Sequence, residues 1–194
     1  MSVMTASRTE LPDDRPLTVR DLDLLPDDGN KYELDDGVLV VSPAPAINHQ
    51  LVLARLTVLL QAAGPADFLV LPGPGVEMTK FQFRIPDLVV VRVDSIGIED
   101  KAVTKPPVLA VEIASPSTAI YDGNRKNDVY ATFGIAAYWI VKPSLDDPRL
   151  TALELRGGSY QQVAEVIGDQ AFQATQPFAV EIIPAALVAG RWQR

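Results

Sequence analysis

The chain has 194 residues, of which 47% are hydrophobic, and its 25 acidic and 17 basic residues give a formal net charge of −8. This length is typical of a single domain with one core. The absence of cysteine and the presence of one histidine, His49, exclude disulfides, thiol nucleophiles, Cys-ligated zinc and two-histidine metal sites. The metals that the chain could hold by itself are therefore those that prefer oxygen ligands, namely Mg²⁺, Mn²⁺ and Ca²⁺.

The acidity is concentrated near the N-terminus. Residues 1–36 contain ten acids and four bases, a net charge of −6, whereas residues 37–194 contain fifteen acids and thirteen bases, a net charge of −2. The overall charge argues against non-specific binding of nucleic acid, although the body of the chain is nearly balanced. We expect residues 1–16 to be a flexible acidic tail and residues 17–194 to form a single domain.

The first half of the chain is predicted to alternate short strands with two helices. Thr18 followed by Asp21 is typical of a helix N-terminus, and Asp35-Asp36-Gly37 between two apolar segments is a hairpin signal. Apolar residues at helical spacing indicate a longer helix before Gly64. The predicted elements are a helix over 18–25, strands over 31–34 and 38–41, a helix over 48–63, and strands over 68–71 and 76–83.

The second half contains the segments that define the sheet. Leu88–Val93 and Val108–Ala114 are continuous apolar runs, which are typical of strands covered on both faces. A helix over 124–133, a buried strand over 137–141, a hairpin of 151–155 with 160–166 and a helix over 184–188 follow. Together these elements predict an α/β (mixed α+β) fold, with a central sheet flanked by helices and an extra C-terminal hairpin. No run of 18 apolar residues and no secretory signal is present, so we expect no membrane contact and a cytoplasmic location.

Two carboxylates lie where burial makes a charge costly. Glu112 is inside one apolar run, and Asp87 opens the other directly after Pro86. If the two strands are neighbours, both carboxylates meet at one end of the sheet, where a divalent cation would offset their repulsion. A buried Glu–Arg pair for Glu112 and an ordinary strand-start aspartate for Asp87 remain the alternatives.

Other polar residues could join these carboxylates. Lys126 and Tyr130 are four residues apart on the predicted helix and share one face, so Lys126 could bring an ammonium group to the site or could be solvated. Glu33 could be a third carboxylate or lie on the strand surface. His49 could point at the site or cap its helix, and Ser117 could supply a hydrogen bond nearby.

The order of these motifs along the chain carries a family resemblance. It runs from about Thr18 to Pro143 and resembles the Uma-type family of putative restriction endonucleases, in the PD-(D/E)XK nuclease superfamily. The motifs are Tyr32-Glu33-Leu34-Asp35-Asp36-Gly37, Ser42-Pro43-Ala44-Pro45 with His49, Arg84-Ile85-Pro86-Asp87, Val111-Glu112-Ile113-Ala114-Ser115-Pro116-Ser117-Thr118, Asp122 with Lys126 and Tyr130, Gly134, and Tyr138-Trp139.

The resemblance implies a restriction-endonuclease-like fold and roles for specific residues. Asp87 and Glu112 would ligate Mg²⁺, with Mn²⁺ as a substitute, and Glu33 would be a third catalytic carboxylate. The superfamily lysine would fall at Ala114, and Lys126 resembles its replacement on the following helix. His49, Ser117 and Tyr130 would line the site.

The implied function is metal-dependent hydrolysis of DNA phosphodiester bonds by an endonuclease. The net charge of −8 and the scattered basic residues motivate an alternative, a catalytically inactive binding or regulatory module that keeps the fold. A structural homodimer is a third interpretation, because Tyr138-Trp139 and the C-terminal hairpin offer apolar surface. We expect a homodimer under each of these interpretations.

Overall fold

The computed structural model describes residues 11–114 and 122–190, with side chains from residue 125 onwards in the second range. Most of the expected tail and Ser117 therefore lie outside the described residues. At the start of the described part, Arg15 forms an ion pair with Asp21 at 2.8 Å, and the main-chain N–H of Leu17 donates to the carbonyl of Gly37.

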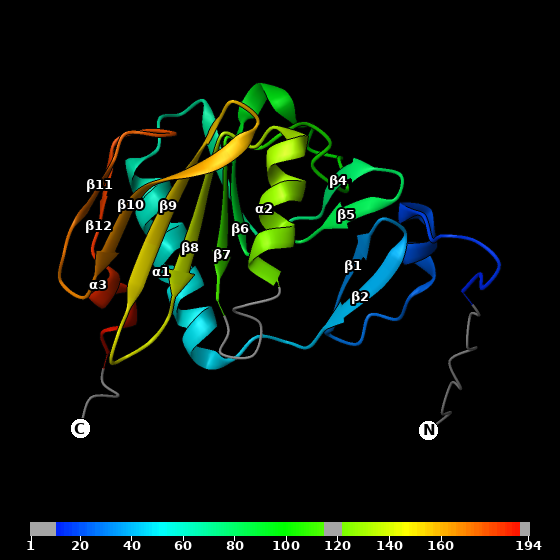
Figure 1. The fold of residues 1–194 in the computed structure, drawn as a ribbon, viewed down its shortest axis with the longest axis horizontal. Coiled ribbons are helices and arrows are strands. Elements are labelled where there is room, and N and C mark those ends of the chain that lie inside the picture. The colour runs from blue at the N-terminus through cyan, green and yellow to red at the C-terminus, as the bar shows by residue number, and fades with distance from the viewer. Residues whose placement is uncertain (1–10, 115–121, 191–194) are drawn as a thin grey trace.

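A six-stranded sheet in the order β10-β9-β8-β7-β6-β3 forms the centre of the protein (Figure 1). β7 and β8 run parallel, and every other neighbouring pair is antiparallel, so the predicted mixed sheet is confirmed. The two apolar runs form the adjacent strands β6 and β7. The bounds are β3 (Phe68–Pro72), β6 (Leu88–Arg92), β7 (Leu109–Ile113), β8 (Ala137–Lys142), β9 (Arg149–Arg156) and β10 (Ser159–Ile167).

Helices cover both faces of this sheet (Figure 1). On one face α1 (Ile47–Ala63) and α3 (Pro184–Val188) share a core with the hairpin of β11 (Phe172–Ala174) and β12 (Val180–Ile182). On the other face α2 (Asp122–Phe133) packs through Tyr130. The chain after the six-stranded sheet thus folds back over α1 and completes the core on that side.

A second sheet in the order β2-β1-β5-β4 stands beside α2 (Figure 1). It contains β1 (Lys31–Asp35), β2 (Val38–Ser42), β4 (Val76–Thr79) and β5 (Gln82–Arg84), and a 3₁₀ helix (Val19–Leu24) precedes it. The predicted hairpin is confirmed. Asp36 and Gly37 form its turn with φ values of 50° and 79°. A two-residue hairpin turn of type I′ requires positive φ at both of its central residues.

One expectation about the strands is wrong. The segment predicted as one strand over 76–83 is a hairpin, because the chain turns at Lys80 and the N–H of Phe81 donates to Thr79 Oγ1 at 3.1 Å. The predicted strand over 68–71 is confirmed as β3, and it pairs with β6. The β11–β12 hairpin was not predicted, because each strand has three residues and short strands give little periodicity.

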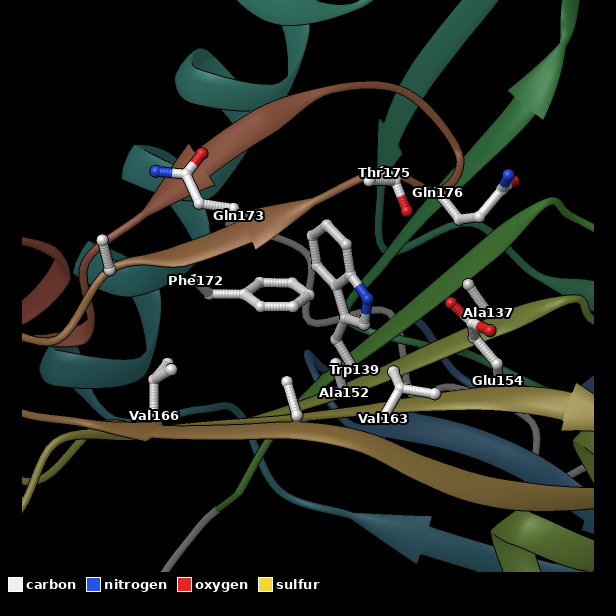
Figure 2. A pocket seen from close by; sticks show the side chains of 12 residues that line it. Ala137, Trp139, Ala152, Glu154, Val163, Val166, Phe172, Gln173, Thr175 and Gln176 are labelled. Carbon is white, nitrogen blue, oxygen red and sulfur yellow. The ribbon is translucent and has the colours of Figure 1, made fainter.

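One of the two surfaces that suggested a structural dimer, Tyr138-Trp139, is internal. Tyr138 and Trp139 are each only 2% exposed, and the Trp139 ring meets Phe172 edge-to-face at a centroid distance of 5.4 Å. Figure 2 shows these two side chains pointing toward one another between the main sheet and the β11–β12 hairpin. The expected homodimer therefore loses Tyr138-Trp139 as support, whereas the predicted hairpin still exposes Val163 and Ile167 on β10, and the homodimer remains a prediction that light scattering can test. Within the described residues, no helix is long and apolar enough to cross a membrane.

Candidate active site

A pocket of about 340 Å³ lies where β6 begins and β7 ends, between the two sheets. The polar and charged side chains that line it include Lys31, Glu33, His49, Asp87, Glu112 and Lys126. The antiparallel register pairs Leu88 with Val111 and Val89 with Ala110. Continuing this register by one residue sets Asp87 directly opposite Glu112, and residues in opposite positions have Cβ atoms about 4.5–5.5 Å apart.

Asp87 is held ionised by donors from three elements. Its Oδ1 accepts a hydrogen bond from Lys31 Nζ at 2.7 Å, and its Oδ2 accepts from the main-chain N–H of Ile113 at 2.8 Å and contacts His49 Nε2 at 2.9 Å. Burial raises the pKa of Asp87, but the bonds from His49 and Lys31 outweigh burial and lower the pKa to about 2. The carboxylate is therefore charged throughout the physiological range.

Glu112 is the opposite case. Its Oε2 accepts from Lys126 Nζ at 3.0 Å, and its Oε1 accepts from the Tyr130 hydroxyl at 2.6 Å. Burial raises the pKa of Glu112, the Lys126 ammonium lowers it, and the nearby carboxylates of Asp87 and Glu33 raise it again, with a net upward displacement. Burial also raises the pKa of Tyr130 well above its usual range, which keeps its hydroxyl protonated as a donor.

Glu33 completes the set of carboxylates and is fixed by neighbours at the end of β5 and directly after it. Its Oε1 accepts from the main-chain N–H of Ile85 at 2.6 Å, and its Oε2 lies 3.8 Å from a guanidinium nitrogen of Arg84. Arg84 is only 2% exposed and also pairs with Asp35 at 2.8 Å. Asp35 in turn pairs with Arg125 on α2, so one chain of charges connects β1 with the helix that carries Lys126.

The structure brings together six of the predicted residues around this pocket. Glu33, His49, Asp87, Glu112 and Lys126 line it, Tyr130 bonds to Glu112 from α2, and Ser117 lies outside the described residues.

Several of the alternative interpretations do not hold. Glu112 pairs with a lysine and not with an arginine, and the Lys126 side chain is 13% exposed and engaged, not solvated. Glu33 is buried and does not lie on the strand surface. His49 does not cap α1, because Ala46 is the N-cap residue and His49 lies buried inside the first turn.

Sequence reasoning missed Lys31. A usable signal was present, because side chains alternate between the two faces of a strand, and Lys31 is two residues before Glu33 on β1. Once Glu33 is placed in the site, Lys31 is expected on the same face.

The chemistry of the donor set fits a hard divalent cation, since carboxylate oxygens are the ligands that Mg²⁺ and Mn²⁺ prefer. Asp87 and Glu112 are the residues that could hold it. Burial, together with the charges of Asp87 and Glu33, raises the pKa of Glu112, and a bound cation would favour its ionised form. Within the described part of the chain, no group of three or more potential ligands is already arranged around one point. Lys31 and Lys126 instead provide the positive charge at Asp87 and Glu112.

Comparison with known proteins agrees with this architecture. Residues 19–186 match the family model "Uma2: Putative restriction endonuclease". The fold is similar to the crystal structure of a putative nuclease belonging to DUF820 from Anabaena variabilis, with a TM-score of 0.69 and 14% sequence identity over 89% of this chain and 98% of that chain. No significant match was found among curated proteins. Because the family model covers most of the chain, including the whole pocket, this protein belongs to the Uma2 family of putative restriction endonucleases.

Proposed function

We propose that this protein is a divalent-cation-dependent endonuclease that hydrolyses phosphodiester bonds of DNA in the pocket at the β6–β7 pair. The observation that carries the proposal is the pair of facing carboxylates, Asp87 and Glu112, with the Lys126 ammonium 3.0 Å from Glu112. Membership of a family described as putative restriction endonucleases supports the reaction class.

Asp87 and Glu112 are the proposed ligands of Mg²⁺ or Mn²⁺. When bound there, the cation would polarise a phosphate oxygen and lower the pKa of a water molecule. The chain's own groups keep the two ligands in place. His49 and the Ile113 N–H hold Asp87 Oδ2, and the Tyr130 hydroxyl holds Glu112 Oε1.

Lys126 is the proposed catalytic cation. Its ammonium group lies at Glu112, where it can orient the attacking water or stabilise the negative charge that develops on the phosphate oxygens. The helix α2 supplies both Lys126 and Tyr130, and the Asp35–Arg125 ion pair fixes α2 against β1. Glu33, anchored by the Ile85 N–H, adds a third carboxylate to the same pocket.

A specific observation also favours the second candidate, an inactive module that keeps the fold. Both proposed ligands already face an ammonium group, and such pairs could stabilise the pocket without any cation. The two functions differ in their response to Mg²⁺ and Mn²⁺, because only the nuclease requires cation binding at Asp87 and Glu112.

The test is the conversion of supercoiled plasmid to nicked and linear forms by purified protein. We expect cleavage in Mg²⁺ or Mn²⁺, none in excess EDTA, and none by Asp87→Asn in either cation. Asp169→Asn, which changes an exposed aspartate, is the matched control and should cleave as the wild type does. Cleavage by Asp87→Asn at the wild-type rate would contradict the proposal.

A further inference from the structure

Lys31 differs from Lys126 in its exposure to solvent. Both lysines line the pocket, and each bonds to one of the two facing carboxylates. The Lys31 side chain is 29% exposed, whereas the Lys126 side chain is 13% exposed. A substrate that enters from solvent therefore reaches Lys31 more readily than Lys126.

Asp87 retains other partners if Lys31 leaves it. Lys31 bonds to Oδ1, while His49 and the main-chain N–H of Ile113 bond to Oδ2. Asp87 is a residue that would hold a divalent cation, and positive charge bound there would repel the Lys31 ammonium from this carboxylate. The freed ammonium is on a flexible four-carbon stem at the pocket rim, and a new anion can satisfy it.

The surroundings of the pocket determine which anion this is. The carboxylates in the pocket already accept hydrogen bonds from neighbouring groups, at Glu33, Asp87 and Glu112. Because the chain as a whole is acidic, binding of a polyanion such as nucleic acid depends on local positive charge. Arg84 cannot supply it, because its guanidinium is buried against Asp35. We propose that Lys31 binds a backbone phosphate of the nucleic-acid substrate once a divalent cation occupies the Asp87 side of the pocket.

This proposal rests on the proposed function and assigns Lys31 a role separate from Lys126. Lys31 binds substrate, whereas Lys126 acts at the reacting phosphate and water. The competing explanation is that Lys31 is only a counterion that positions Asp87. The two explanations differ in what removal of the ammonium does to DNA affinity and to cation affinity.

The experiment measures binding of a short fluorescein-labelled DNA duplex by anisotropy in Ca²⁺ over a series of salt concentrations, with the integrity of the probe checked on gels. For Lys31→Met we expect the Kd at low salt to rise about tenfold. The negative slope of the logarithm of the association constant against the logarithm of the salt concentration should become smaller in magnitude by about one. Lys31→Arg should restore most of the affinity. Lys105→Met, which changes an exposed lysine outside the pocket, should match the wild type.

Calorimetric titration of the same variants with Ca²⁺ separates the two explanations. Loss of the competing ammonium should leave the Ca²⁺ affinity of Lys31→Met equal to or higher than that of the wild type. The proposal is overturned if Lys31→Met leaves the DNA Kd and the salt slope unchanged. It is also overturned if a loss of Ca²⁺ affinity accounts for the whole loss of DNA affinity, or if the wild type does not bind DNA.

The outcome can be distinguished from failure of the proposed function. If the wild type cleaves no plasmid in Mg²⁺ or Mn²⁺ but Lys31→Met still weakens DNA binding and lowers the salt slope, hydrolysis is wrong and the phosphate contact stands. If the wild type cleaves and Lys31→Met binds DNA normally, the nuclease stands and the role of Lys31 is wrong.

Discussion

Asp87, directly before β6, and Glu112 on β7 occupy facing positions, yet their pKa values are displaced in opposite directions. Burial opposes the charge of both carboxylates. At Asp87 the donors, including the Lys31 ammonium, outweigh it. At Glu112 the Lys126 ammonium and the Tyr130 hydroxyl do not, because the charges of Asp87 and Glu33 add to the effect of burial. The surroundings of Asp87 thus stabilise its ionised form, whereas the surroundings of Glu112 disfavour its ionised form. This asymmetry leads to different predictions for the two residues.

Substitution of Glu112 tests whether its negative charge lowers the stability of the folded protein. Because the pKa of Glu112 is raised, its contribution to stability is present below its ordinary pKa and is lost as the pH rises through the folded-state pKa. Glu112→Gln should therefore unfold at the same temperature as the wild type or higher, at neutral pH in EDTA, while activity is lost. Thermal unfolding of both proteins beside Glu99→Gln, an exposed control, provides the measurement. A clearly lower Tm for Glu112→Gln would show that its charge stabilises the fold.

Asp87 should show the reverse dependence on pH. Its pKa falls from 3.8 to about 2 on folding, so its contribution is present above its ordinary pKa and is lost as the pH falls toward 2. The displacement corresponds to about 2 kcal/mol. In urea unfolding without cations, Asp87→Asn should be less stable than the wild type by about this amount at neutral pH, and the difference should shrink below pH 3.8. A difference that stays constant across the series would remove this explanation.

Divalent cations should stabilise the folded protein through the two facing carboxylates. At a cation concentration of about one hundred times the Kd, binding to the folded state contributes about 2.7 kcal/mol, or about 5–10 °C in Tm for a chain of this length. We expect this shift with Mg²⁺ or Mn²⁺ for the wild type and for Asp169→Asn, and its loss in Asp87→Asn and Glu112→Gln. If neither cation raises the Tm of the wild type, the inactive module becomes the better interpretation.

Lys126 should affect the reaction and not the binding of the cation. Removal of a general acid–base or charge-stabilising group lowers rates by about 10²–10⁴-fold, and we expect a loss in this range for Lys126→Met under single-turnover conditions. The thermal shift with Mn²⁺ should persist in this variant. Lys126→Arg should recover part of the rate. If Lys126→Met cleaves as fast as the wild type, the catalytic cation must be another group.

The residues that form the site could largely be predicted from the sequence because their signals are local. A glutamate inside a continuous apolar run is conspicuous at Glu112, and Pro86 marks the strand start that holds Asp87. The i, i+4 spacing of Lys126 and Tyr130 correctly placed both on one helix face, where each bonds to Glu112.

Features that depend on long-range pairing could not be predicted in the same way. No glycine or proline marks the turn at Lys80, so residues 76–83 read as one strand, although the apolar positions shift there from 76 and 78 to 81 and 83. The partner of Asp87 on β1, Lys31, is 56 positions away in sequence. Trp139 read as available surface because the β11–β12 hairpin that covers it gave no periodic signal. Tyr138 is covered on the opposite face of the sheet by Tyr130 and Tyr160.

The most direct test of the central claim is the rate of DNA cleavage in Mn²⁺ by Glu112→Gln, measured beside Glu99→Gln and the wild type prepared in the same way. We predict that the wild type and Glu99→Gln cleave at equal rates and that Glu112→Gln, while fully folded, gives no product. Equal cleavage by all three proteins, or cleavage by none of them, would contradict the assignment of this pocket as a nuclease site.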